Sequence, residues 1–391
     1  MRKQKNSFEK NIDVPFFIPW ITKKDKNEIL SALNSSLLTL GPKLEEFENE
    51  FAKFTGSKYA IGVSNASAAL QLAIKVLGIK KTDQIILPDF TFVSTATAVV
   101  NNNATPVLAD VDIDSFNIST ESIKKKINHK TKAILPVHFA GKSCNMKEIK
   151  KIAKTNNLFI IEDCAHGIGT KFSNKHVGTF GDIGCFSFYP TKNITTLEGG
   201  MLITNSKKIA EDLRSLRNHG MTKSLSQRYG KGKPWDYDVK TLGFNFRLDE
   251  IRATLGLSQL KRIRNLNNLR RKACRYYNEQ LKEIKGITTP KITNKDSCHL
   301  YIIKIEDNYP LKRDMLYKKM IDKGIRTTVH YKPIHEFSFF KKFGIKKELE
   351  QSSKLYKKVL SLPLFPQISR KEQNKVINCI NNSYLQSHDK R

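Results

Sequence analysis

The stretch Leu158–Cys164 has the sequence LFIIEDC, four apolar residues followed by two carboxylates and a cysteine. A short apolar run of this kind is typical of a strand that is buried on both faces, as in parallel sheets. Ligands of open α/β sheets bind beyond the carboxyl ends of the strands. We therefore predict that Glu162 and Asp163 end a central strand at a binding site, with His166 three residues further on. The alternative is a capping pair beside a hydrogen-bonded histidine.

Strand-like and helix-like patterns alternate on both sides of this stretch. The other expected strands are Tyr59–Val63, Gln84–Leu87, Pro106–Val111, Lys132–Phe139, Gly184–Tyr189 and Met201–Thr204. The expected helices are Ala66–Leu77, Phe92–Asn101, Met146–Thr155 and Lys207–Asn218. Such alternation predicts an α/β protein with a mostly parallel sheet that helices cover on both faces.

The pattern changes at Asp249, where a long helix is expected to begin and to run to about Ile284. We predict a large α/β domain over residues 13–250 and a smaller C-terminal α+β domain over residues 251–391, with the long helix linking them. The elements expected beyond the helix are a strand Leu300–Ile305, a helix Leu311–Asp322, a strand Ile325–His330 and a terminal helix Lys371–Tyr384.

The chain of 391 residues has 68 Lys and Arg against 37 Asp and Glu, a net charge of +31. The basic residues are spread in short groups such as Lys124-Lys125-Lys126 on the polar faces of amphipathic patterns. We interpret them as a solvated surface and do not expect nucleic acid as a partner, and a polyanion site is the alternative. A diphosphate-bearing small molecule would also benefit from the positive field.

Other features of the composition exclude further classes of protein. No apolar run approaches the roughly 18 residues that a membrane span needs. The start, MRKQKNSFEKNID, lacks the apolar segment of a secretory signal. The six cysteines include no C-x-x-C pair, so we predict no metal site and a reduced, cytoplasmic compartment.

Small polar residues follow the first expected strand. The sequence Ser64-Asn65-Ala66-Ser67-Ala68 opens an apolar helix, where a ligand can approach free backbone N–H groups and the hydroxyl of Ser67. This arrangement is typical of a phosphate site. A plain helix N-cap is the alternative.

Lys192 follows another buried strand, within FSFYPTKN (residues 186–193), and its neighbours are uncharged. A lysine in such a place can have a lowered pKa and attack carbonyl groups. The alternative is a surface lysine in a lysine-rich chain. Taken together, an amine that can form a Schiff base, a carboxylate for a pyridinium nitrogen and a phosphate site describe pyridoxal phosphate.

These motifs, in this order, resemble the DegT/DnrJ/StrS family of nucleotide-sugar aminotransferases, which are fold-type-I pyridoxal phosphate enzymes. The resemblance covers nearly the whole chain. It is carried by TLGP (39–42), VSNASAAL (63–70), PDFTFVSTA (88–96), PVHFAG (136–141), EDCAHG (162–167), FSFYPTKN (186–193), EGGM (198–201), RNHGM (217–221), LGFNFRLDEI (242–251) and VHYKPIH (329–335).

The resemblance implies roles for single residues. Lys192 is the implied Schiff-base lysine and proton carrier, and Asp163 the implied partner of the pyridinium nitrogen. The other implied cofactor contacts are Ala66, Ser67, Ala68 and Ser187 at the phosphate, Phe92 and His166 at the ring, and Asn245 at the phosphate of the neighbouring subunit. The resemblance thus implies a homodimer with shared active sites, and it places His330 and Tyr331 near the nucleotide-linked sugar.

The same resemblance implies the reaction. L-glutamate is the expected amino donor, and a nucleotide-linked 4-keto-6-deoxy sugar is the expected acceptor, for glycan or surface polysaccharide synthesis. The segment at residues 231–251 resembles the 4-aminating, perosamine-synthase-like branch. A 3-keto sugar aminotransferase, a sugar dehydratase with the same cofactor, and a non-catalytic polyanion-binding or sensor protein are the alternatives. Lysine at position 192 favours transamination, because relatives that dehydrate carry histidine there.

Overall fold

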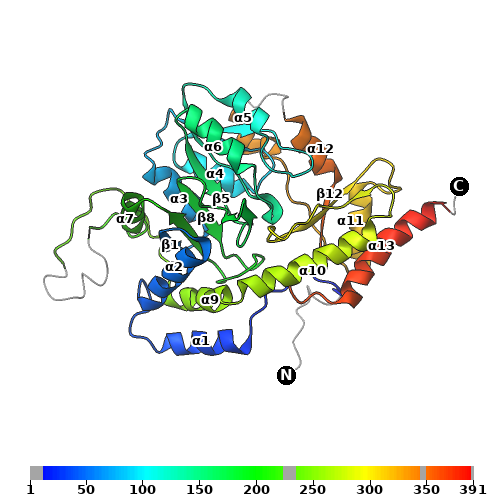
Figure 1. Ribbon diagram of the computed structural model, residues 1–391, viewed down its shortest axis with the longest axis horizontal. Coiled ribbons are helices and arrows are strands. Elements are labelled where there is room, and N and C mark those ends of the chain that lie inside the picture. Colours follow the sequence, from blue (N-terminus) through cyan, green and yellow to red (C-terminus); the bar gives the residue numbers. More distant parts are fainter. Residues whose placement is uncertain (1–11, 223–234, 344–348, 389–391) are drawn as a thin grey trace.

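The computed structural model describes residues 12–222, 235–343 and 349–388. The strands of its central sheet are β1 Tyr59–Val63, β2 Gln84–Pro88, β3 Thr105–Ala109, β4 Thr131–Ile134, β5 Phe159–Asp163, β8 Ile183–Ser187 and β9 Gly200–Thr204. They lie in the order β1-β9-β8-β5-β4-β2-β3. Strands β1, β8 and β5 of this sheet are labelled in Figure 1. Strand β9 is antiparallel to both β1 and β8, whereas the other neighbours run parallel. The mostly parallel sheet is therefore confirmed.

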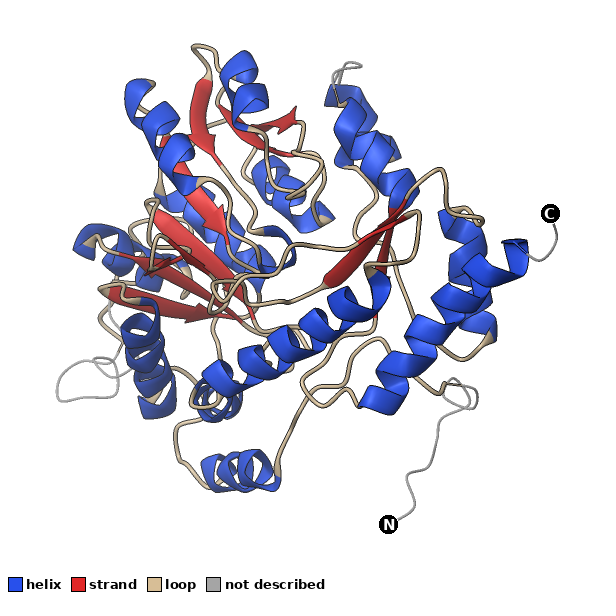
Figure 2. Cartoon of the chain, turned by 45° about the vertical axis from the view of Figure 1, so that its right-hand side comes forward, coloured by secondary structure: helices blue, strands red, loops and turns tan. Residues whose placement is uncertain are grey.

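Helices cover both faces of this sheet (Figure 2). Helices α3 Ala66–Val76, α4 Val93–Asn101 and α7 Lys207–Leu216 pack on one face, and α2 Pro42–Thr55, α5 Thr120–Lys126, α6 Met146–Thr155 and α9 Glu250–Leu260 pack on the other. Successive strand residues separate between the two layers because their side chains alternate in direction. Ile161 of β5, for example, packs in the core under α3, α4 and α7, and Ile160 packs in the core under α5 and α6.

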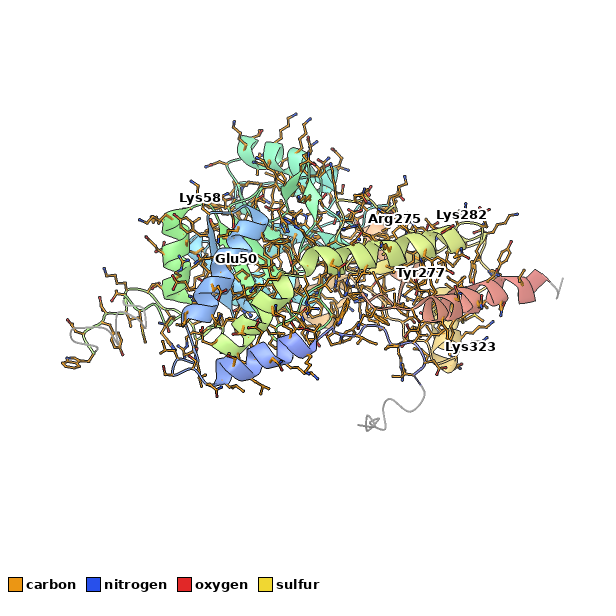
Figure 3. The ribbon with its side chains drawn as sticks, turned by 60° about the horizontal axis from the view of Figure 1, so that its bottom comes forward. Glu50, Lys58, Arg275, Tyr277, Lys282 and Lys323 are labelled. Atoms are coloured by element: carbon orange, nitrogen blue, oxygen red, sulfur yellow. The ribbon has the colours of Figure 1, made fainter. Side chains whose placement is uncertain are left out.

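A second, smaller sheet lies in the C-terminal part of the chain. It contains β10 Ile287–Thr288, β11 Tyr301–Ile305 and β12 Val359–Leu362, and helices α10 Ile263–Leu281, α11 Arg313–Asp322 and α13 Arg370–His388 pack around it. Tyr277 of α10 points into the core around this smaller sheet, whereas Arg275 and Lys282 lie on the outer side of the helix (Figure 3). The domain boundary at residues 250 and 251 stays a prediction.

The single long helix expected from Asp249 to about Ile284 is wrong, because the chain bends between α9 and α10. At the bend, the guanidinium of Arg262 donates to Asp25 Oδ2 at 2.6 Å and lies over the ring of Trp20. Asp25 is fully buried at the start of helix α1 Lys23–Leu33. The N-terminal helix thereby holds the bend.

Two expected strands also differ from the structure. Strand β4 ends at Ile134 rather than Phe139, because Pro136 has no N–H for a ladder and Val137 makes only an isolated bridge to Asp163. No strand covers Ile325–His330. Ile325 bridges Val14 and Thr328 bridges Ser361, so no continuous ladder forms.

A buried carboxylate ties the C-terminal part of the chain to the central sheet. Asp89 follows β2, and its two oxygens accept hydrogen bonds from the N–H of His335 at 3.0 Å and from its ring Nδ1 at 2.7 Å. His335 lies in the short helix η3 Ile334–Glu336. The hydrogen bond that His335 donates to Asp89 raises the pKa of His335; the charges of Asp89, Glu336 and Asp110 also raise it, and burial opposes them.

We expect the substitution His335→Gln to destabilise the protein more at pH 6 than at pH 8. Because the pKa of His335 is higher in the folded protein, its interaction with Asp89 stabilises the fold fully below the ordinary pKa of 6.5. This contribution is lost as the pH rises through the folded-state pKa. The expected loss in the free energy of unfolding at pH 6 is about 1–2 kcal/mol. Denaturant titrations at both pH values, with the exposed His129→Gln as control, measure it, and an equal loss at both would contradict the ion pair.

Candidate active site

A cavity of about 600 Å³ opens at the carboxyl ends of the parallel strands. Its position agrees with the general rule for ligands of open α/β sheets. The predicted site residues that line it are Ala66, Ser67, Phe92, Asp163, His166, Ser187, Lys192, His330 and Tyr331. Segments that are far apart in the sequence thus meet in one place.

Asp163 and Lys192 are two oppositely charged residues that line this cavity. Asp163 ends β5, and its carboxylate accepts hydrogen bonds from the N–H of Ala165 at 3.0 Å and from the hydroxyl of Thr95 at 2.9 Å. Burial raises the pKa of Asp163, which these hydrogen bonds and the charge of Lys192 oppose. Burial lowers the pKa of Lys192 to about 8, which Asp163 opposes. The amine is therefore more often neutral at pH 7 than an ordinary lysine.

The start of helix α3 forms the polar end of the cavity. Asn65 is the N-cap, and its side-chain oxygen accepts the N–H of Ala68 at 2.8 Å. The N–H groups of Ala66 and Ser67 belong to the first turn, where no intrahelical acceptor exists. The positive end of the helix dipole and the hydroxyls of Ser67 and Ser187 can together hold a phosphate. Ala68 is buried, and its N–H is already bonded within the cap.

Glycine at position 200 permits the close approach of β9 to this helix start. A Cβ atom on Gly200 would lie 2.6 Å from the carbonyl carbon and oxygen of Asn65 and 2.9 Å from the nitrogen of Ala66. All three are backbone atoms, which cannot move aside as a flexible side chain can. The geometry of the helix start therefore depends on the missing side chain.

Aromatic rings form the opposite part of the cavity. Phe92 is half exposed, and its ring lies 5.7 Å from that of Tyr331. The rings of His166 and Tyr331 are nearly parallel at 6.1 Å, and the hydroxyl of Tyr331 lies 3.2 Å from His166 Nε2. His330 is bonded through Nδ1 to the hydroxyl of Ser361 at 2.8 Å. A planar ligand ring has apolar faces available here.

Ala68 and Asn245 are the two predicted site residues that do not line the cavity, and Asn245 lies furthest from the expectation. It is exposed and makes a backbone bridge to Asn218. This position does not bring it to the cavity of its own chain. Part of the segment at residues 231–251 that resembled the 4-aminating branch, residues 231–234, lies outside the described residues.

Sequence analysis missed several residues of the site. Thr95 orients Asp163, and His299 lies with its ring 4.4 Å from that of His166 and with Nδ1 3.2 Å from Asn193 Oδ1. Thr95 lies in the motif PDFTFVSTA, but its spacing from Asp163 in the sequence gave no signal of a contact. Asn193 directly follows Lys192 and could have been singled out on that ground.

A mostly parallel sheet with a lysine, a carboxylate and a helix N-terminus at its carboxyl edge defines the class of fold-type-I pyridoxal phosphate transferases. The profile of the DegT/DnrJ/EryC1/StrS aminotransferase family matches residues 19–381, and the chain belongs to this family. The resemblance seen in the sequence, the expected fold and the expected aminotransferase are therefore confirmed.

One relative and two structural neighbours show how far the similarity extends. The chain is 36% identical to the spore coat polysaccharide biosynthesis protein SpsC of Bacillus subtilis, over 95% of this chain and 97% of SpsC. It is 31% identical to PseC of Helicobacter pylori, an aminotransferase involved in the biosynthesis of pseudoaminic acid, with a TM-score of 0.89 over 95% of this chain and 99% of that chain. NtdA of Bacillus subtilis, solved with bound pyridoxamine phosphate, is 28% identical, with a TM-score of 0.83 over 94% of this chain and 83% of that chain.

We expect Gly200→Ala to weaken binding of pyridoxal phosphate about tenfold, because the added Cβ displaces the backbone of Asn65 and Ala66. Tenfold corresponds to about 1.4 kcal/mol. Titration of the apoprotein by absorption measures the dissociation constant. The control is Gly62→Ala in β1, where the added Cβ meets the side chain of Leu44 at 2.7 Å, away from the cavity. Equal weakening in both variants would contradict a specific role of Gly200.

Proposed function

We propose that this chain transfers an amino group from L-glutamate to a nucleotide-linked 4-keto-6-deoxy sugar for surface polysaccharide synthesis. The chain is a sugar aminotransferase of the DegT/DnrJ/EryC1/StrS family. The proposal adds the amino donor, the nucleotide carrier and the 4-keto position of the acceptor. The observation that carries the proposal is the buried pair of Lys192 and Asp163 in a cavity that also has a phosphate-binding helix start.

Pyridoxal phosphate is the cofactor, as expected from the sequence. The donor set fits it: Lys192 offers an amine, Asp163 a carboxylate, and Ser67, Ser187 and the N-terminus of α3 offer neutral phosphate donors. When bound, the cofactor supplies an electron sink and carries the amino group between the two substrates.

The residues of the chain perform the remaining tasks. With a pKa of about 8, about one Lys192 amine in ten is neutral at pH 7 and can act as a nucleophile or accept a proton. Asp163 holds a proton on the ring nitrogen, and Thr95 fixes the direction of its carboxylate. Phe92 and His166 hold the ring from the apolar parts of the cavity.

The alternatives differ at specific positions. Lysine at position 192 supports amino transfer over dehydration, because histidine cannot form the covalent link to the cofactor. The alternative within the same reaction is a 3-keto acceptor, which differs in the carbon of the sugar that receives the amine. A non-catalytic polyanion-binding protein is set aside by membership in the aminotransferase family.

We also propose a homodimer with shared active sites. Asn245 is exposed away from the cavity of its own chain, and apolar side chains around it are exposed as well, among them Leu242 at 80%. Burial of such residues against a second copy would stabilise a dimer. The same contact would allow Asn245 to reach the phosphate of the neighbouring subunit.

Within the described residues, no helix combines the length and the hydrophobicity that crossing a bilayer requires. We propose a cytoplasmic enzyme.

We expect Lys192→Ala to abolish amino transfer and the visible absorption band of the bound cofactor, because the variant lacks the amine that binds it covalently. The measurement is an absorption spectrum with pyridoxal phosphate, before and after L-glutamate. Lys132→Ala, which removes an exposed lysine of β4, is the control and is expected to behave like the wild type. Amino transfer by Lys192→Ala would overturn the proposal, and a wild-type band that glutamate leaves unchanged would show that the donor is wrong.

Shared active sites predict that two inactive variants complement each other. A mixture of Lys192→Ala and Asn245→Asp subunits is expected to recover up to about a quarter of the wild-type activity, because mixed dimers hold one intact site. Activity measured after mixing, unfolding and refolding tests this, with each variant alone as control. Activity of the mixture no higher than that of the single variants would argue against a contribution of Asn245 across the interface.

A further inference from the structure

Two hydrogen bonds hold the ring of His166, and chemistry fixes the direction of one of them. The backbone N–H of Ala140 points at His166 Nδ1 at a distance of 3.2 Å. A backbone N–H can only donate, so Nδ1 must offer a lone pair and carries no proton. Ala140 lies in the short helix η2 Phe139–Gly141.

The turn that supplies this N–H is itself held in place. Ala140 has a φ of 55°, which residues with a side chain rarely adopt. Its carbonyl oxygen accepts the N–H groups of His299 at 3.0 Å and Leu300 at 3.4 Å. The strained residue is therefore fixed on both sides, between His166 and the segment that leads into β11.

The second hydrogen bond of the ring runs to Tyr331. Burial lowers the pKa of His166 well below 6.5, and the positive charge of Lys192 adds to this effect. The neutral ring has one N–H, which must be on Nε2 because Nδ1 accepts from Ala140. Nε2 lies 3.2 Å from the hydroxyl oxygen of Tyr331, so His166 donates and Tyr331 accepts.

The hydroxyl proton of Tyr331 must then point elsewhere. Burial raises the pKa of Tyr331, so the proton is present at neutral pH. In the part of the chain that the structure describes, His166 is the hydrogen-bond partner of this hydroxyl. Tyr331 lines the cavity together with Lys192, and the ring of Phe139 packs edge-on against it at 5.9 Å. The cavity is where an acceptor for this proton can lie.

We propose that Tyr331 is a fixed hydrogen-bond donor to an oxygen atom of the molecule that reacts beside Lys192, and that Ala140 and His166 set the direction of its proton. We take that molecule to be the ketosugar, and on this point the inference rests on the proposed function. An oxygen of the cofactor ring has the same acceptor chemistry, and the experiments below separate the two sources. His166 acts here as a positioning residue for Tyr331.

The tautomer can be tested without substrate or cofactor. Imidazole ¹⁵N shifts of the apoprotein distinguish a nitrogen with a proton from one without, and the signals of His166 are those that vanish in His166→Gln. We expect a bare Nδ1 and a protonated Nε2 from pH 6 to pH 8. A proton on Nδ1, or titration of His166 in this range, would overturn the inference, whatever the reaction of the enzyme is.

Tyr331→Phe tests the donor, because it removes the hydroxyl and keeps the ring. We expect kcat/KM for the sugar to fall tenfold or more, with the rate of the glutamate half-reaction and the cofactor spectrum unchanged. A spectrum that shifts in the absence of sugar would instead identify the cofactor oxygen as the acceptor. The control is Tyr276→Phe, which removes a hydroxyl bonded to Asn374 in the C-terminal part of the chain. Unchanged spectra and kinetics in Tyr331→Phe would refute the donor role.

A conservative variant separates positioning from packing. In His166→Gln, the amide oxygen can accept from Ala140 and the amide nitrogen can donate to Tyr331. Both hydrogen bonds of this relay, from Ala140 through residue 166 to Tyr331, therefore keep their direction. Because His166 is also a proposed contact of the cofactor ring, both variants are compared at saturating cofactor. We expect His166→Gln to keep more of the kcat/KM for the sugar than His166→Met, which cannot donate to Tyr331 and should lose about as much as Tyr331→Phe. Equal losses in both variants would contradict the relay. Absence of amino transfer by the wild type would refute the proposed function and leave the tautomer measurement standing.

Discussion

The desolvation of the Lys192 amine is the physical effect on which the site depends. Burial alone lowers the pKa, and the carboxylate of Asp163 raises it, with a balance at about 8. Asp163 can play this part because it is itself buried and oriented by Thr95 and the N–H of Ala165. Neither charge would be stable in the cavity without the other, since an unpaired buried charge is costly.

The topology of the sheet brings these groups together. Strands β5 and β8 run parallel, so Asp163 at the end of β5 and Ser187 at the end of β8 reach the same edge. The antiparallel strand β9 inserts between β8 and β1, and Gly200 lets it meet the start of α3 at close range. The carboxylate and the helix start that we propose to bind phosphate are thus fixed by backbone geometry, and the lysine lies in the loop after β8.

Sequence patterns predicted the features that depend on local order. The apolar run of β5 and the ordered motifs were sufficient for the α/β class and for the residues around Lys192. The break between α9 and α10 could not be predicted, because Arg262 is held by Asp25, 237 residues earlier in the chain. The roles of Thr95 and Ala140 likewise depend on tertiary contacts, and the position of Asn245 relative to a second subunit depends on assembly.

The positive charge of the chain lies mostly outside the cavity, since Lys192 is the one Lys or Arg among the described residues that line it. The charged side chains that line the cavity are Asp163, Lys192 and Glu198, because burial lowers the pKa of His166 and His330 and leaves these rings neutral. The groups that we propose to hold the phosphate, namely the helix start and two serines, are also neutral. A further lysine or arginine there would compete with Lys192 for Asp163 and lower the pKa of the amine further. The proposed phosphate site, being neutral, would therefore leave the protonation of Lys192 to burial and to the carboxylate of Asp163.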